Sequence, residues 1–150
     1  MQTEESIFTI GYEKSTIDAF VSRLVDAEIE VLVDVRELPL SRKAGFSKNG
    51  LDAAVSEAGI EYLHVKALGD PKPGRDAARA GNHDLFVEIF TQHMDGEVAQ
   101  SALTELADTV RGKRICLTCF ERHHEGCHRK IVAERLSALV GMPVEHIAVN

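Results

Sequence analysis

The densest group of chemically versatile side chains lies between residues 119 and 129, which read CFERHHEGCHR. A thiol in the first turn of a helix feels unpaired backbone N–H groups and the positive end of the helix dipole, and both lower its pKa. Cys127, followed by His128 and Arg129, is therefore a candidate thiolate nucleophile. The same N–H groups, with Arg129, could instead bind a phosphate or carboxylate without any covalent step.

Cys119 is a second candidate nucleophile, because it ends an apolar run that reads as a strand. Glu121 follows two residues later and is a candidate acid or base beside Cys119. The alternative for Glu121 is an ordinary solvated turn residue.

The cysteines and histidines of this stretch also raise the question of a zinc site. Cys116 and Cys119 are three apart in an expected strand, so their side chains should point to opposite faces of the sheet. A zinc knuckle needs a turn between its first two ligands. We therefore expect no metal site and no cofactor, and we interpret Cys116 as a small core residue.

A carboxylate and a guanidinium come together in the segment Val-Asp-Val-Arg at residues 33–36. Side chains two apart in a strand share a face, so Asp34 and Arg36 should be neighbours. They could form an ion pair that shapes the next loop. Alternatively, Arg36 could hold an anion that Asp34 orients or deprotonates, with help from Arg42 in that loop.

The elements that must position these residues alternate between strands and helices. Strands are expected at residues 7–10, 29–35, 60–65, 115–119 and 144–147, and helices, the first capped by Ser15, in most intervals between them. Residues 69–74, rich in glycine and proline, are expected to form a loop. This order predicts one α/β domain over residues 1–150, a three-layer Rossmann-like fold whose mainly parallel sheet of about five strands has helices on both faces.

In such folds ligands bind outside the carboxyl ends of the strands. The candidate residues all follow or end predicted strands, or open the helix after one. We expect one shared site with catalytic candidates Asp34, Cys119, Glu121 and Cys127 and ligand-binding candidates Gly11, Tyr12, Arg36, Arg42, His128 and Arg129.

Bulk composition narrows the class of protein. The longest apolar runs are far shorter than the roughly 20 residues of a membrane span, and no signal-peptide pattern opens the chain. Three cysteines are too few for a disulfide framework, so we expect thiols in a cytoplasmic protein. The net charge of -7 does not favour a nucleic-acid partner, although residues 111–130 are locally basic. The pattern predicts no particular oligomeric state.

Several segments together resemble a known family. They are residues 9–12, 33–36, 59–62 and 68–69, Pro39 with Ser41 and Arg42, and Cys119 to Glu121 followed by Cys127 to Arg129. This order, from Thr9 to about Leu136, is similar to the domain of unknown function family 488. The resemblance implies an α/β domain and marks these residues as motif positions, and it supplies no reaction.

A weaker likeness is to rhodanese domains, which also have a Val-Asp-Val-Arg-like strand and a later strand that ends in cysteine. After its cysteine a rhodanese has a short loop of backbone N–H groups rich in small residues. Here Phe120 and Glu121 follow instead, and an acidic side chain would oppose an anionic persulfide.

Three functional hypotheses remain open at this stage. The first is an enzyme that acts on an anionic, phosphate-bearing ligand, related to nucleotides or nucleic acids, at the carboxyl edge of the sheet. The second is a cysteine-based protein of sulfur transfer or redox chemistry. The third is a ligand-binding domain without catalysis, in which the same residues only fix loop structure.

Overall fold

The computed structural model describes residues 6–121 and 127–149. The strands are β1 (Ile7–Gly11), β2 (Val31–Asp34), β3 (Glu61–His64), β4 (Ile115–Cys119) and β5 (Val144–His146). The helices are α1 (Ile17–Asp26), α2 (Lys48–Glu57), α3 (Lys72–Arg79), α4 (His83–Asp95), α5 (Glu97–Val110) and α6 (His128–Val140), with a short 3₁₀ helix, η1 (Lys66–Leu68). The turn expected at residues 122–126 lies outside the described residues.

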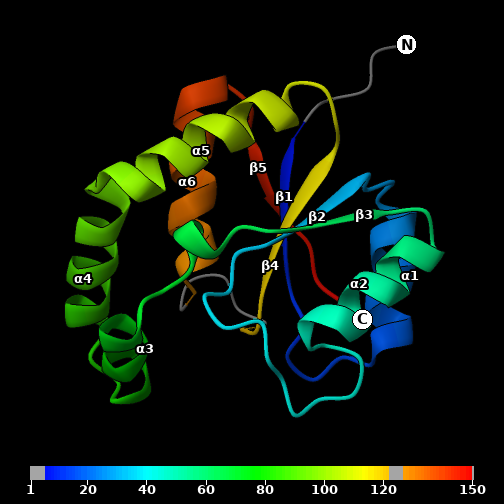
Figure 1. The fold of residues 1–150 in the computed structure, drawn as a ribbon, viewed down its shortest axis with the longest axis horizontal. Coiled ribbons are helices and arrows are strands. Elements are labelled where there is room, and N and C mark those ends of the chain that lie inside the picture. Colours follow the sequence, from blue (N-terminus) through cyan, green and yellow to red (C-terminus); the bar gives the residue numbers. More distant parts are fainter. Residues whose placement is uncertain (1–5, 122–126, 150) are drawn as a thin grey trace.

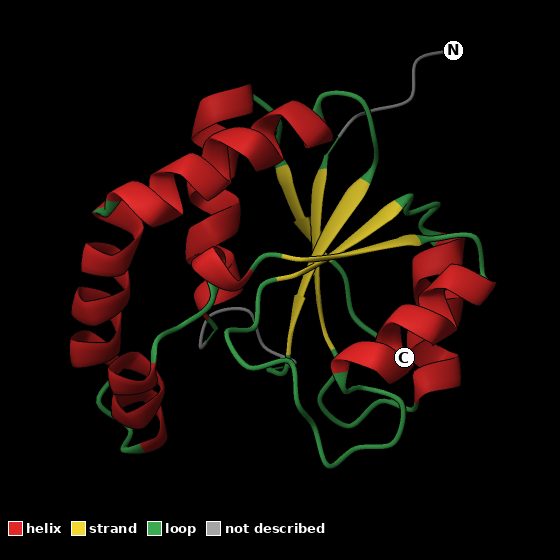
Figure 2. Ribbon diagram, in the orientation of Figure 1, coloured by secondary structure: helices red, strands yellow, loops and turns green. Residues whose placement is uncertain are grey.

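The strands form one parallel sheet in the order β3-β2-β4-β1-β5. Helices α1 and α2 cover one face, and α4, α5 and α6 cover the other (Figures 1 and 2). The predicted three-layer α/β architecture is therefore confirmed. A sheet covered on both faces needs strands that are apolar throughout, and β1, β2 and β4 are buried at every residue.

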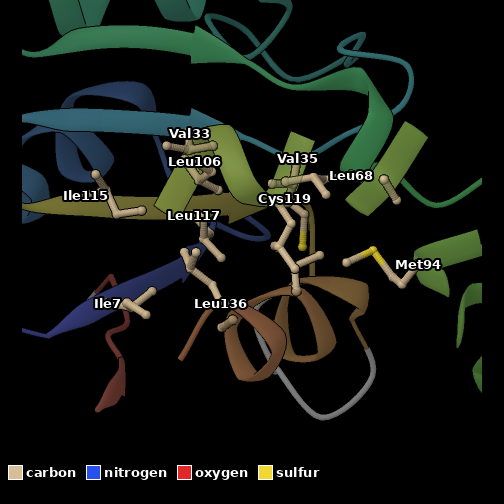
Figure 3. Packing of buried hydrophobic residues seen from close by; sticks show 14 of the residues in the cluster. Ile7, Val33, Val35, Leu68, Met94, Leu106, Ile115, Leu117, Cys119 and Leu136 are labelled. Carbon is tan, nitrogen blue, oxygen red and sulfur yellow. The ribbon is translucent and has the colours of Figure 1, made fainter. Parts of the chain in front are cut away.

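Two hydrophobic cores result, because alternate strand residues point to opposite faces. Leu32 and Cys116 belong to the core beneath α1 and α2. Val33, Leu117 and Cys119 belong to the core beneath α4, α5 and α6, part of which Figure 3 shows. The expectation that Cys116 and Cys119 face opposite sides is confirmed.

Strand β4 occupies the place where the strand order reverses. Its neighbours β1 and β2 lead into α1 and α2 on one face, whereas β4 leads into α6 on the other. Because the connections diverge at this point, a crevice opens beyond the carboxyl end of the strand. Cys119, the last residue of β4, therefore lies at the topological switch point.

Two local expectations are wrong. Residues 72–79 form helix α3 rather than a loop, because Pro73 lies in the first turn, where its missing N–H has no helical partner to lose. The cap of α1 is Thr16 rather than Ser15, and its side chain accepts a hydrogen bond from the Ala19 N–H at 3.1 Å.

A helix needs about 20 apolar residues to cross a lipid bilayer. The longest described helix, α5, has 14 residues. Neither it nor any other described helix combines the length and the apolar character of a bilayer-spanning segment.

Candidate functional site

A cavity of about 590 Å³ lies at the carboxyl edge of the sheet. Its walls come from the segments after β1, β2 and β4, from the start of α6 and from the region around α3. Nine lining residues carry polar or reactive groups: Tyr12, Arg36, Glu37, Asp70, Arg75, Arg79, Cys119, Glu121 and His128. The carboxyl ends of separate strands therefore contribute to one pocket.

One wall rests on the pair Asp34 and Arg36. Arg36 Nε and Nη2 donate to the two carboxylate oxygens of Asp34 at 2.8 and 2.7 Å, and the Arg36 backbone N–H donates to Oδ1 at 3.1 Å. Tyr62 donates its hydroxyl to Asp34 Oδ2 at 2.6 Å. Arg36 Nη1 donates to the Tyr12 hydroxyl at 3.1 Å and to the Phe46 carbonyl at 2.7 Å. We call these five residues the Asp34–Arg36 network.

The network is deeply buried, since Asp34 is 0% exposed and Arg36 6%. Burial alone would lower the pKa of Arg36, but the hydrogen bonds and charge of Asp34 outweigh it and raise the pKa above its ordinary value. Four of the five guanidinium N–H groups face protein acceptors. Asp34 is absent from the pocket lining. The predicted neighbourhood of the two side chains is confirmed, and its geometry is that of an internal ion pair.

The second predicted group centres on sulfur. Cys119 at the end of β4 and Cys127 at the N-cap of α6 are joined by a disulfide. Both are buried, and Cys119 lines the pocket. The expectation of three thiols is therefore corrected: Cys116 alone is a free thiol in this structure. The reason is that helix α6 begins beside the end of β4, so Cys127 at its N-cap lies against Cys119.

Charged groups surround the sulfur atoms. Arg129, which is 1% exposed, donates from Nη1 to Cys119 Sγ at 3.3 Å and to the Glu121 carbonyl. Glu121 Oε2 lies 3.5 Å from Cys119 Sγ. Burial raises the pKa of Glu121, and the nearby Arg129 only partly opposes that shift.

His128 is fixed in one tautomer. Its Nε2 is bonded to the backbone carbonyl of Val35, and because a carbonyl only accepts, Nε2 must carry the proton. The lone pair of Nδ1 then faces Cys127 Sγ at 3.7 Å. Burial lowers the pKa of His128 to about 4, despite the opposing hydrogen bond to Val35, so the ring is neutral at physiological pH.

Asp70 is a site residue that the sequence analysis missed. It is 5% exposed, lines the pocket, and its Oδ1 has no hydrogen-bond partner among the described residues. Burial raises its pKa to about 7; the charge of Arg75 lowers it, whereas Glu121 and Glu37 raise it further. Only its position beside Gly69, in a segment of tight turns, could have hinted at this role.

Three predicted ligand-binding residues, Gly11, Arg42 and the buried Arg129, do not join the lining. Arg42 is exposed and outside the cavity. Gly11 pairs in register with Cys119 at the strand ends but is not among the lining residues either, whereas its neighbour Tyr12 is. The edge therefore gathers most, but not all, of the residues that the sequence singles out.

Comparisons with known proteins agree with the family resemblance. Residues 16–136 match the family described as "Domain of unknown function DUF488". Neither the curated proteins nor the solved structures contain a significant match to the chain.

Proposed function

The chain belongs to the DUF488 family, whose description names no reaction, and from the geometry of its own site we propose that Cys119 and Cys127 form a redox-active pair that exchanges with thiols in the pocket. The observation that carries this proposal is the disulfide between the last residue of β4 and the N-cap of α6, with one sulfur on the pocket wall.

The two sulfurs have different surroundings, which assigns them different roles. Cys119 lines the cavity and is the sulfur that an entering thiolate attacks. Cys127 is the leaving group, because its sulfur accepts a 3.5 Å hydrogen bond from the Arg129 backbone N–H at the start of α6. The helix N-terminus stabilises the thiolate that departs, and a better leaving thiolate speeds exchange.

The electron balance is that of ordinary thiol–disulfide exchange. A substrate thiolate forms a bond to Cys119 Sγ, the bond between Cys119 and Cys127 breaks, and Cys127 leaves as a thiolate. A second substrate thiol then displaces Cys119. The protein gains two electrons and two protons, and the substrate dithiol becomes a disulfide.

The pocket mouth suggests the class of thiol. Leu38, Leu40 and Phe120 line the cavity and expose 52%, 72% and 46% of their surfaces. A thiol on a partly apolar molecule, such as a cysteinyl peptide, would cover these side chains. The sequence predicts a reducing compartment, where disulfides are usually transient and catalytic rather than structural.

Trapping of the mixed disulfide tests the assignment. In Cys127→Ser, glutathione disulfide should convert Cys119 into a stable mixed disulfide, measured by intact mass and peptide mapping. In Cys119→Ser the corresponding adduct on Cys127 should form more slowly, because Cys127 is not in the pocket lining. Cys116→Ala serves as the matched control and should behave as wild type. Equal rates in the two serine variants, or no adduct on Cys119, would refute the proposed roles.

A second candidate function is the binding of a small phosphate-bearing ligand, such as a nucleotide. It is favoured by Arg79, an exposed residue of α3 that lines the cavity, and by its neighbour Arg75, which already pairs with Glu37. Arg36 is less suited to this task, because its donors are engaged in the Asp34–Arg36 network. Calorimetric titration with a nucleotide panel should show binding that Arg79→Met weakens about tenfold or more and Arg42→Met leaves unchanged, since a lost charged hydrogen bond is worth roughly 1.5–3 kcal/mol. Absence of binding by every nucleotide would exclude this function.

A further inference from the structure

We propose that the reduced chain binds one transition-metal dication of the zinc type through Cys119 Sγ, Cys127 Sγ and His128 Nδ1. These residues each offer one ligand atom, and the three atoms lie within 4.8 Å of one another. They come from the end of β4, the N-cap of α6 and the first residue of α6. The proposal goes beyond thiol exchange and does not depend on it, since a metal site needs only the two reduced sulfurs and the imidazole.

The imidazole is prepared for metal binding. Because the Val35 carbonyl accepts a hydrogen bond from His128 Nε2–H, the Nδ1 lone pair is directed to the sulfurs. Metal-binding histidines commonly donate their second ring N–H to a carbonyl or carboxylate, which fixes the ring and its tautomer. Phe90 packs its ring edge-on against His128 at a centroid distance of 5.2 Å and restricts the ring further. The orientation is therefore fixed before any ion arrives.

The donor set selects the class of metal. Two thiolates and a neutral imidazole favour Zn²⁺ and related ions over Mg²⁺ or Ca²⁺, which prefer oxygen. Binding releases the two thiol protons, so the two thiolate charges balance the dication. The disulfide form offers no thiolate, and it should bind no metal here.

A fourth ligand would reach the cluster from its pocket side. Cys119 and His128 both line the cavity, and Glu121 Oε2 is 3.5 Å from Cys119 Sγ. Three protein ligands with a fourth position open to water or a ligand are the pattern of catalytic rather than structural zinc sites. Arg129, which donates to Cys119 Sγ, can continue to do so when that sulfur binds a metal, because hydrogen bonds to ligating sulfur are common at metal centres.

The cluster differs from the zinc knuckle that the sequence argues against. That argument concerns Cys116 and Cys119, which face opposite sides of the sheet. Here the second cysteine comes from the next helix. The chain itself therefore supplies a matched control, because its remaining cysteine, Cys116 on β4, faces the other side of the sheet and cannot reach this site.

Titration of the reduced protein with Co²⁺ under anaerobic conditions tests the proposal. One equivalent should produce sulfur-to-cobalt charge-transfer absorption in the near ultraviolet together with tetrahedral d–d bands, and Zn²⁺ should abolish both. Cys116→Ala should retain the spectrum. Cys119→Ser, Cys127→Ser and His128→Asn should each weaken Co²⁺ binding at least tenfold, with circular dichroism to confirm that each variant is folded.

The wild-type chain provides a test that needs no substitution. Oxidation of the pair, or alkylation of the reduced cysteines, should abolish the charge-transfer band. The absence of a band in the reduced wild type, a band that forms in Cys127→Ser with unchanged affinity, or a band that survives alkylation of both cysteines would overturn the metal site. None of these results would affect the mixed-disulfide experiment, so the two proposals can fail separately.

Discussion

Two groups of polar residues meet at the same edge of the sheet, and they differ in where their hydrogen bonds go. In the Asp34–Arg36 network, both carboxylate oxygens and most guanidinium donors are bonded to other protein groups beneath the surface. Around Cys119 and Cys127, reactive atoms border a cavity of about 590 Å³. We interpret the first group as the one that holds the edge together and, under the proposed function, the second group as the one that reacts.

The largest expected effect is a loss of stability, and it tests whether the Asp34–Arg36 network holds the edge together. Arg36→Met leaves the Asp34 carboxylate buried without its guanidinium partner, and breaking such a pair costs about 3–5 kcal/mol of unfolding free energy. Urea denaturation measures the loss. Arg79→Met, at an exposed position on the same pocket, is the control and should change stability by less than about 0.5 kcal/mol.

A double variant sharpens this prediction. Asp34→Asn combined with Arg36→Met removes both charges, so it should lose less stability than Arg36→Met alone, because no unpaired charge is left buried. If Arg36→Met were as stable as wild type but lost ligand binding, Arg36 would be a ligand-binding residue rather than a structural one.

The next effect concerns the sulfur pair. The disulfide joins residues eight positions apart, and closure of such a loop is worth about 2–3 kcal/mol. Dithiothreitol should therefore lower the unfolding free energy of the wild type by that amount. Cys116→Ala should show the same decrease and Cys127→Ser none. A decrease that persists in Cys127→Ser would mean that the reductant acts elsewhere.

The smallest effect, measured per pH unit, is a pH dependence of stability at the pocket. With its pKa raised to about 7, folded Asp70 holds a proton that the unfolded chain releases above about pH 4. Its contribution to stability is complete below about pH 4 and is lost as the pH rises to about 7, at up to about 1.4 kcal/mol per pH unit. Asp70→Asn should lack this slope in urea denaturation.

His128 changes the stability with pH in the opposite direction to Asp70. The pH dependence of wild type must therefore be compared with that of Asp70→Asn. Its lowered pKa makes the folded chain bind fewer protons than the unfolded chain between about pH 4 and 6.5, and stability from this group rises with pH. The difference between wild type and Asp70→Asn isolates Asp70, because His128 is present in both. An unchanged difference between about pH 5 and pH 8 would show that Asp70 is not buried as a proton-binding group.

Much of the arrangement at the carboxyl edge of the sheet can be predicted from local sequence patterns. Alternating strands and helices predict the parallel sheet, and the parallel sheet brings strand ends together. The two-residue spacing of Asp34 and Arg36 predicts their pairing, which the structure confirms. The spacing does not reveal that Arg36 Nη1 donates hydrogen bonds to Tyr12 and Phe46, because these partners come from other loops.

The pocket around Cys119 and Cys127 is harder to predict from the sequence, because its geometry depends on tertiary structure. Asp70 is unremarkable in the sequence, and it becomes a site residue only because α3 forms where two prolines and a glycine suggest a loop. A Cβ on Gly74 would lie 2.0 Å from Asp70 Oδ1, so this glycine permits the close approach. The tautomer of His128 likewise depends on Val35, which is 93 positions away in the chain.

Differential alkylation of the wild-type protein across a series of glutathione redox ratios tests the central claim most directly. Free thiols are blocked with one reagent, disulfides are then reduced and blocked with a second, and each cysteine is scored by peptide mass spectrometry. The account predicts that Cys119 and Cys127 change label together in a single two-electron transition, while Cys116 stays a thiol throughout. Independent transitions of Cys119 and Cys127, or thiols at both positions under every oxidising ratio, would contradict it.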